Sequence, residues 1–446
     1  MRTPIHDFLN EYSARGAVRL HMPGHKGVSH IGIEDRDITE IDGADSLYHA
    51  DGIIRESESI ASELFGSGLT VYSTEGSSQC IKAMLYLAKL NSTQEQGYVL
   101  AGRNAHASFI SAAALVGFDV EWLYPPAPSS YLSCEITESA VEEYLSSCER
   151  LPFAVYITSP DYLGNIADVS GLARACHKYS VPLIVDNAHG AYLKFLDKSI
   201  HPIDLGADMC CDSAHKTLTA LTGAAYLHIS RCAPESFFSG VKGAMALFGS
   251  TSPSYLIMES LDLQNRYIAD GYATRLREMA KKIDSLKDKL RKLGYSLIGN
   301  ERMKITLRAS DIGYCGKELA EIFAERGVVC EFSDPDFIVF MLSADNSESD
   351  INALLSVLSD IKPRVASREA EPTLVPHPER RMSVREAVFS KKEHTLMRNA
   401  KGRVLAASGV SCPPAVSLIV AGEVIDEQII SLCERYGIYE CDVVIE

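Results

Sequence analysis

Short apolar runs alternate with helical segments over the middle of this chain, and this alternation restricts the fold more than any other feature. The runs lack the alternating pattern of half-exposed strands, which is typical of parallel strands buried on both faces. The strand-like runs are residues 98–101, 118–123, 154–158, 181–185, 207–211 and 224–229. Between several of them, apolar residues recur every three or four positions, as on one face of a helix. The pattern predicts an α/β fold whose large domain contains a mostly parallel sheet of about seven strands.

The flanking segments predict an arm before this sheet and a smaller domain after it. Residues 4–13 have helical spacing and precede a loop, HMPGHKG at residues 21–27. Apolar residues from position 272 to position 290 step by three or four, which predicts a long amphipathic helix bridging two domains. We therefore expect an N-terminal arm over residues 1–50, a large domain over 51–294 that includes the long helix, and a C-terminal α+β domain over 295–446.

The composition is that of an ordinary globular enzyme. The 446 residues include 43 Lys+Arg and 59 Asp+Glu, so the formal net charge is −16. This acidic balance argues against nucleic acid as a partner, because phosphate backbones are bound by clustered Lys and Arg. The sequence has neither a secretory signal pattern nor an apolar run of ~18 residues, so we expect a cytoplasmic protein that does not bind membranes. The 12 cysteines contain no Cys-x-x-Cys; we expect free thiols and no metal site.

Gly76, Ser77 and Ser78 lie where a helix is predicted to begin. Glycine permits close approach of the backbone, and the two hydroxyls and the free N–H groups of a helix start can bind a phosphate. The alternative interpretation is an ordinary capped helix, which Gly-Ser-Ser more often indicates when taken alone. The tripeptide is therefore a candidate phosphate site that depends on the rest of the pattern.

Asp186 and Lys216 each follow a predicted strand, at the sheet edge where ligands of open α/β sheets bind. A partly desolvated carboxylate at this edge needs a cationic partner, such as a protonated ring nitrogen. Asp186 could instead cap the turn that follows it. A partly buried lysine can form a Schiff base with an aldehyde, although most lysines are simply solvated. A phosphate site, an acid and a lysine together are the groups needed to bind pyridoxal phosphate.

His106 follows another predicted strand, in RNAHASF at residues 103–109. From this position it could stack on the face of the cofactor ring. A helix-capping or core histidine is an equally good interpretation of the residue alone.

With these residues in place, the chain closely resembles the bacterial ornithine/lysine/arginine decarboxylase family, which has the aspartate-aminotransferase-like pyridoxal-phosphate fold. The resemblance covers most of the chain, through several blocks in the same order. The blocks are HMPGHKG (21–27), TEIDGADSL (39–47), STEGSSQ (73–79), RNAHASF (103–109), DNAHGAY (186–192), SAHKTL (213–218) and TSPSYLIMESLD (251–262).

The resemblance implies a role for each candidate site residue. Lys216 would be the aldimine lysine, Asp186 the partner of the pyridinium nitrogen, and His106 the stacking residue. Ser77, Ser78, Ser213 and His215 would contact the phosphate or the ring, and His189 would lie beside the cofactor. Lys216 or His215 would return a proton to the substrate α-carbon.

Thr251 and Ser252 are, by the same resemblance, expected to approach the cofactor phosphate of a partner subunit. The smallest active unit would then be a homodimer, or a dimer of dimers with shared sites. The alternative for these residues is an ordinary helix start before an apolar run. Larger relatives carry an extra N-terminal domain that mediates higher assembly; this chain has no room for one before residue 21, so we do not expect a decamer.

Near the C-terminus the chain departs from the family. Relatives usually have Pro-Pro-Gly-x-Pro there, whereas this chain reads Pro-Pro-Ala at residues 413–415. Alanine adopts a positive φ less readily than glycine, so we expect this region to be shaped differently. The departure leaves the identity of the substrate open.

The function that these features predict is decarboxylation of a basic amino acid, arginine, lysine or ornithine, to its amine. The substrate would be a small amino acid and the cofactor pyridoxal 5'-phosphate. Another pyridoxal-phosphate reaction on the same scaffold, by an aminotransferase or a lyase, is the alternative. A non-catalytic relative is a third hypothesis, although all the proposed cofactor residues are present.

Overall fold

The chain divides into two compact units, each built from separate stretches of sequence. Unit 1 comprises Met1–Glu95, Glu142–Tyr156 and Val169–Thr274; unit 2 comprises Gln96–Val141, Ile157–Asp168 and Arg275–Glu446. This computed structural model describes residues 1–94, 97–126, 130–364, 375–407 and 415–445. The domain limits expected at residues 50 and 294 stay predictions.

The largest sheet has seven strands in the order β1-β7-β6-β5-β4-β2-β3, which confirms the predicted fold class. Its strands are β1 (Leu69–Ser73), β2 (Tyr98–Gly102), β3 (Asp119–Leu123), β4 (Ala154–Thr158), β5 (Leu183–Asp186), β6 (Met209–Asp212) and β7 (Ala225–Ile229). Strands β5 and β6 are parallel, as are β2 and β3. Strand β7 runs antiparallel to both β1 and β6. Its short connection from β6 suits an antiparallel pair, which needs no long crossover.

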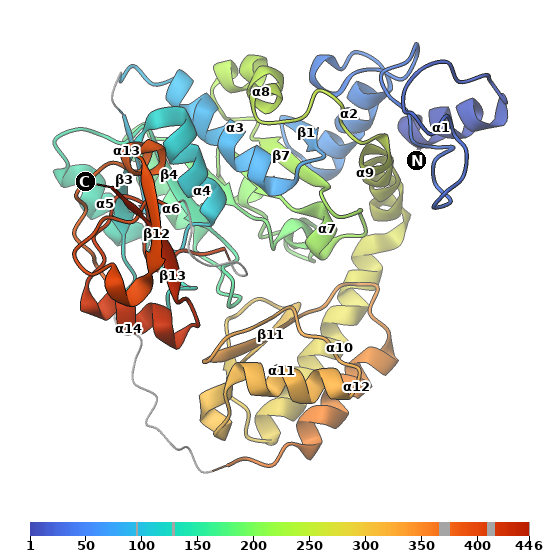
Figure 1. Ribbon diagram of the computed structural model, residues 1–446. Helices are drawn as coiled ribbons and strands as arrows, with labels where there is room; N and C mark the ends of the chain where they lie inside the picture. Colours follow the sequence, from blue (N-terminus) through green and yellow to red (C-terminus); the bar gives the residue numbers. More distant parts are fainter. Residues whose placement is uncertain (95–96, 127–129, 365–374, 408–414, 446) are drawn as a thin grey trace. The chain divides into compact units, whose positions relative to one another are not determined.

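Unit 1 contains helices as well as strands, and several of these helices pack on the sheet. The helices are α1 (Pro4–Ala14), α2 (Ile53–Phe65), α3 (Gly76–Leu90), α6 (Val169–Lys178), α7 (Ala214–Thr217), α8 (Glu235–Leu247) and α9 (Tyr255–Tyr267), with α5 (Glu138–Ser147) shared between the two units. Helix α3 packs against β6, β7 and α8 (Figure 1). Its buried face includes Ile81, Met84, Leu85 and Ala88, as the helical spacing predicted.

Shorter turns connect these elements in unit 1. They are η1 (Leu47–His49), η3 (Ala191–Phe195), η4 (Pro202–Leu205) and η5 (Ile268–Tyr272). In η5 the helical path is interrupted at Gly271, whose φ of +80° lies in the left-handed region. The long amphipathic helix predicted from the spacing is α10 (Ala273–Lys292), which follows directly.

Unit 2 contains two antiparallel sheets. Strands β8 (Leu297–Ile298), β9 (Lys304–Arg308), β10 (Phe332–Ser333) and β11 (Phe337–Met341) form one in the order β10-β11-β9-β8, and β12 (Lys392–Leu396) pairs with β13 (Glu440–Val444) in the other. The remaining helical elements are α4 (Ala107–Ala112), η2 (Ala113–Gly117), η6 (Ala309–Ile312), α11 (Gly316–Glu325), α12 (Glu348–Asp360), α13 (Val384–Phe389), η7 (Met397–Asn399) and α14 (Glu427–Arg435). Helix α11 packs on β10 and β11.

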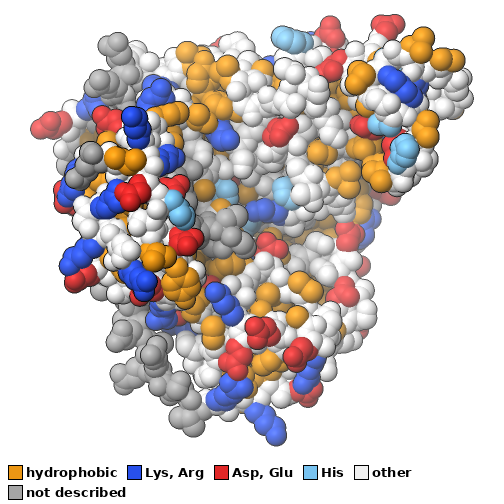
Figure 2. Space-filling model, viewed as in Figure 1, with side chains coloured by type: hydrophobic (Ala, Val, Ile, Leu, Met, Phe, Trp, Pro, Cys, Tyr) orange, Lys and Arg blue, Asp and Glu red, His pale blue; other side chains and the backbone are white. Residues whose placement is uncertain are grey.

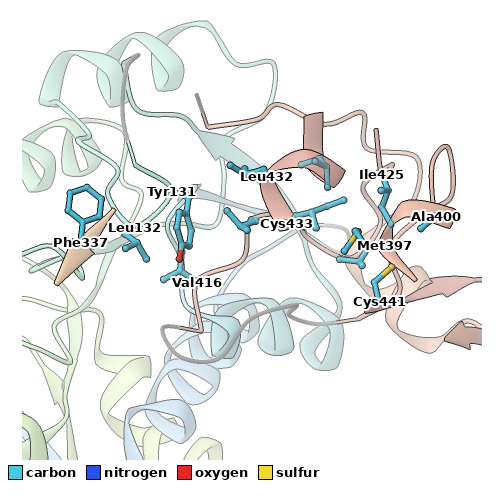
Figure 3. Packing of buried hydrophobic residues seen from close by; sticks show 14 of the residues in the cluster. Tyr131, Leu132, Phe337, Met397, Ala400, Val416, Ile425, Leu432, Cys433 and Cys441 are labelled. Atoms are coloured by element: carbon cyan, nitrogen blue, oxygen red, sulfur yellow. The ribbon is translucent and has the colours of Figure 1, made fainter. Parts of the chain in front are cut away.

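A buried apolar cluster holds segments of unit 2 together that are distant in sequence (Figure 3). Tyr131 and Leu132 pack in it with Met397, Cys433 and Cys441 from the C-terminal part of the chain. Full burial of each large apolar side chain contributes roughly 1.5–3 kcal/mol. The cluster therefore explains why the C-terminal segment folds back onto the segment that follows β3.

The N-terminal arm is held to unit 1 at the start of α1. The backbone N–H groups of Ile5 and His6 both donate to Oδ2 of Asp262 in α9, each at 3.0 Å. Figure 2 shows hydrophobic side chains at the surface of the region around α1. Beyond α1, several apolar side chains of residues 18–33 are exposed, including Val18 (84% exposed), Leu20 (90%) and Ile31 (78%). No helix among the described residues has the length and apolar character to span a membrane.

Candidate active site

The predicted phosphate site lies at the start of α3 in unit 1. Gly76 has φ +72° and donates its N–H to the carbonyl of Gly223 at 2.8 Å. A Cβ at Gly76 would meet none of the described atoms within 4 Å, so the space at the helix start is open. The N-cap is Glu75, and it makes no side-chain capping bond. Ser77 and Ser78 thus lie in the first turn and do not serve as the cap.

A serine pair connects the start of α3 with the end of β6. Oγ of Ser213 donates to Oγ of Ser77 at 3.0 Å. Ser213 is buried and directly follows Asp212, the last residue of β6. The fold therefore brings together two of the predicted phosphate contacts, although 136 residues separate them in sequence.

Asp186 ends β5 and is 3% exposed. Its Oδ2 accepts from the hydroxyl of Tyr156 at 3.2 Å, and its Oδ1 accepts from the N–H of Ala188 at 3.1 Å and from the thiol of Cys211 at 3.6 Å. Burial raises the pKa of Cys211 well above its ordinary value, which keeps the thiol protonated as a donor. The bond to Ala188 is the turn-capping contact considered as an alternative, and the same carboxylate also makes the other two contacts.

Lys216 lies in α7, and its Nζ is 2.9 Å from Nε2 of His189. His189 follows Asp186 by three residues, so this contact joins the turn after β5 to the turn after β6. Nδ1 of His215 is 2.9 Å from the carbonyl oxygen of Ala224. Because a carbonyl can only accept, the proton is at Nδ1, and Nε2 is the basic nitrogen of the neutral ring.

His106 lies in unit 2, where it caps α4. Its Nδ1 accepts from the N–H of Ser108 at 3.1 Å, which agrees with the capping alternative. Thr251 and Ser252 are exposed in unit 1, in the segment before α9. The N–H of Ser252 donates to Oγ of Ser250 at 3.1 Å, and the N-cap of α9 is Ser254. The predicted roles of these three residues stay predictions.

The C-terminal departure has a local consequence in unit 2. Ala415 adopts φ +57°, so alanine occupies here the left-handed conformation that we expected it to avoid. Its carbonyl accepts from the N–H of Ala107 at 2.7 Å, and Val416 forms a β-bridge with His106. These contacts hold the strained residue beside the start of α4. Residues 412–414 of the same stretch lie outside the described residues.

Sequence reasoning missed a buried polar network behind the site. Asp212 contacts Asn187, His201 and His228, all of them buried. One signal was available: Asp212 ends an apolar strand, and the same position had singled out Asp186. The two histidines gave no signal, since each stands alone in its sequence segment.

The donor set fits pyridoxal phosphate. Unit 1 offers an amine for its aldehyde at Lys216, a buried carboxylate for its ring nitrogen at Asp186, and two adjacent hydroxyls at Ser77 and Ser213 for its phosphate. The open space at Gly76 lies at a helix start, where backbone N–H groups and the helix dipole favour an anion.

Residues 3–307 match the profile of the family described as Orn/Lys/Arg decarboxylase, major domain. The chain belongs to this family. One relative, the uncharacterized protein YaaO of Bacillus subtilis, is 27% identical to this family member, with 98% of this chain and 94% of the relative covered. An arginine decarboxylase of Bacillus cereus is 25% identical, with coverage of 94% and 96%. The crystal structure of a lysine decarboxylase from Francisella novicida superimposes with a TM-score of 0.80 at 17% identity, covering 99% of this chain and 81% of that one.

Membership of the Orn/Lys/Arg decarboxylase family makes this protein an amino-acid decarboxylase of a pyridoxal-phosphate-dependent type. The family match includes all of the residues that form the candidate site in unit 1. The likeness to the lysine decarboxylase structure extends over almost the whole chain, and it confirms the fold.

Proposed function

We propose that this protein decarboxylates a basic amino acid, arginine, lysine or ornithine, with pyridoxal 5'-phosphate bound covalently to Lys216. The observation that supports the proposal is that Lys216 contacts His189 and Ser213 contacts Ser77 in unit 1, where Asp186 ends β5 and the Ser213–Lys216 turn follows the neighbouring strand β6. Five such side chains in the positions of family motifs support the assignment more strongly than any one of them alone. Of the named relatives, one is an arginine decarboxylase and another is a lysine decarboxylase.

Each residue has a task that follows from its place. The first turn of α3 and the hydroxyls of Ser77, Ser78 and Ser213 would bind the phosphate. The buried carboxylate of Asp186 would hold a proton on the ring nitrogen by ion pairing. Bound pyridoxal phosphate supplies an electron sink that stabilises negative charge at the substrate α-carbon.

The reaction breaks the bond between the α-carbon and the carboxylate carbon, and carbon dioxide leaves. The electron pair of that bond then takes up one proton at the α-carbon. Lys216 and His215 are the candidate donors of this proton, because both lie in α7. His189 contacts Nζ of Lys216 and can exchange a proton with it.

The remaining assignments concern His106 and the partner subunit. We propose that His106 stacks on the cofactor ring, a role compatible with its use of Nδ1 as a helix cap. Thr251 and Ser252 are proposed to contact the cofactor phosphate of a second subunit, which their exposure in one chain permits. The exposed apolar side chains of residues 18–33 support a homodimer, because apolar patches on one chain are commonly covered by another.

A basic amino acid also suits the charge of the protein. The formal net charge of −16 attracts cationic substrates and raises their encounter rate. The effect does not select among arginine, lysine and ornithine, and the family match does not either.

The proposal is tested by replacing Lys216. K216A should reduce release of carbon dioxide from the preferred amino acid by at least about 10³-fold, since both covalent attachment and a proton donor are lost. K198A is the matched control, because Lys198 is an exposed lysine of the same unit, and it should retain wild-type activity. Steady-state amine production by K216A at the wild-type rate would contradict the assignment.

A further inference from the structure

A single buried carboxylate joins four parts of unit 1 directly behind the candidate site. Oδ1 of Asp212 accepts from Nδ2 of Asn187 at 2.7 Å. Its Oδ2 lies 2.9 Å from Nε2 of His201 and 3.2 Å from Nε2 of His228. All four residues are completely buried. They come from the turn after β5, the start of η4, the end of β6 and the second-to-last position of β7.

The proton positions show that this cluster is a hydrogen-bonded network. The N–H of Ile203 donates to Nδ1 of His201 at 3.4 Å, so the neutral ring carries its proton on Nε2 and donates it to Asp212. His201, Cys210 and Asp212 also have the donor spacing of a metal site. Binding a metal through Nε2 would require the proton at Nδ1, where the backbone N–H already points, so the hydrogen-bonded arrangement suits these residues better.

The network keeps Asp212 ionised in the protein interior. Burial would raise the pKa of Asp212, but its interactions with the rings of His201 and His228, each of which donates from Nε2, outweigh burial and hold the pKa below the ordinary value. Burial lowers the pKa of His228, which keeps that ring neutral and able to donate. Nδ1 of His228 lies 2.8 Å from Oγ1 of Thr70, which supplies its second partner. A buried ion with three side-chain donors contributes little net stability compared with apolar packing, so another role is worth seeking.

Asp212 is connected to both halves of the candidate site. Along the chain it precedes Ser213 and lies four residues before Lys216. Through Asn187 it holds the residue that follows Asp186, and the N–H of Asn187 also donates to the carbonyl of Cys211 at 3.0 Å. The same carboxylate therefore restrains the turn that carries the acid and the turn that carries the lysine.

We propose that Asp212 is a positioning residue of the cofactor site, which sets the geometry of Asp186 relative to the Ser213–Lys216 turn through Asn187 and the two histidines. The inference rests on the proposed function. It goes beyond that function by assigning a role to a network on the opposite face of β6 from Cys211, whose thiol contacts Asp186.

The test compares D212N with D208N. The amide that D212N introduces cannot accept from Asn187 and from both histidines at once, so the network breaks with almost no change in volume. Asp208 is the matched control: it is buried at the other end of β6, where it contacts Nε2 of His177 at 2.9 Å and the N–H of Leu183 at 2.8 Å. N187A is a second variant, which cuts only the connection to the turn of Asp186.

Three readouts separate positioning from stability. They are thermal unfolding of the apoprotein, the dissociation constant of pyridoxal phosphate by equilibrium dialysis, and the visible absorption spectrum of the bound cofactor. We expect D212N and N187A to weaken cofactor binding by about 10-fold or more and to change the spectrum, whereas D208N should leave both as in the wild type. If D212N does not fold, N187A alone decides the question in the same way.

Two outcomes would overturn the inference. One is that N187A and the folded D212N bind the cofactor with wild-type affinity and spectrum while only their thermal stability falls; the network would then be structural. The other is that D208N changes cofactor binding as much as D212N does. Failure of the proposed function is a distinct result, because the wild-type protein would then bind no pyridoxal phosphate or would release no carbon dioxide from arginine, lysine or ornithine.

Discussion

Nζ of Lys216 lies 2.9 Å from Nε2 of His189, and this contact joins the turns that follow two neighbouring parallel strands, β5 and β6. The two residues are 27 positions apart in sequence. The contact puts an imidazole in direct reach of the amine that we propose to carry the cofactor and to return a proton to the substrate.

Replacement of His189 tests whether this contact takes part in proton transfer. H189Q keeps a polar side chain of similar length but removes the imidazole, which can both accept and donate a proton. We expect kcat to fall by about 10²-fold with the cofactor still bound. H177Q is the control, because His177 contacts Asp208 away from the site. An H189Q enzyme with the kcat of the wild type would show that His189 has no part in the chemistry.

The serine pair predicts a measurable loss of cofactor affinity. Oγ of Ser77 and Oγ of Ser213 lie 3.0 Å apart, so both would contact one phosphate group. S77A and S213A should each weaken binding of pyridoxal phosphate about 5- to 10-fold, as expected for one hydrogen bond of about 1 kcal/mol. Fluorescence titration of the apoprotein gives the dissociation constants. S146A removes an exposed hydroxyl bonded to the carbonyl of Glu143 and should bind the cofactor as the wild type does. Wild-type affinity in S77A and S213A as well would argue against a phosphate at this pair.

Ala415 predicts a stabilising substitution. Its φ of +57° is unfavourable for alanine by roughly 1–2 kcal/mol and costs glycine almost nothing. Part of this gain is lost to the greater entropy of glycine in the unfolded chain, so A415G should raise the free energy of unfolding by about 0.5–1 kcal/mol. Urea denaturation measures the change. The control A320G, within α11, should lower the free energy of unfolding by about 1 kcal/mol. A loss of stability in A415G as well would contradict the left-handed conformation of Ala415.

Asp262 predicts how stability depends on pH. Burial raises its pKa to about 6, although the N–H groups of Ile5 and His6 and the hydroxyl of Ser57 act in the opposite direction. Because the folded state binds this proton more tightly than the unfolded state, the contribution of Asp262 to stability is greatest below about pH 4 and is lost as the pH rises to about 6.

The variant D262N isolates this effect, since asparagine does not titrate and its carbonyl can still accept from the start of α1. The free energy of unfolding of the wild type should fall relative to that of D262N as the pH rises from about 4 to about 7. A difference that is constant over this range, or that moves in favour of the wild type, would contradict the raised pKa.

Most of the sheet could be predicted from the sequence, because buried parallel strands are short apolar runs bounded by polar or turn-forming residues. Residues 98–101 and 154–158 are recovered almost without change as β2 and β4. The direction of β7 was beyond such an argument, since an apolar run has the same composition whichever way it pairs. The composition of the two compact units was equally out of reach, because each interleaves three stretches of chain; the domain limits expected at residues 50 and 294 stay predictions.

Part of the candidate site could be predicted because its residues follow the ends of predicted strands. Lys216 and Asp186 could be singled out because each follows an apolar run, and Ser77 because it begins a helix. The contacts of Asp212 with His201 and His228 could not, since they depend on which strands become neighbours. The use of His106 as a helix cap was one of two interpretations that its sequence position left open.

The most direct test of the central proposal is the visible absorption spectrum of the purified protein, reconstituted with pyridoxal phosphate and mixed separately with arginine, lysine and ornithine while carbon dioxide is recorded. We expect a visible cofactor band that changes with at least one of the three, together with one carbon dioxide for each amine formed. A cofactor band that none of them alters, with no release of gas, would contradict basic amino-acid decarboxylation and favour another pyridoxal-phosphate reaction. A protein that stays colourless after reconstitution would contradict the cofactor site itself.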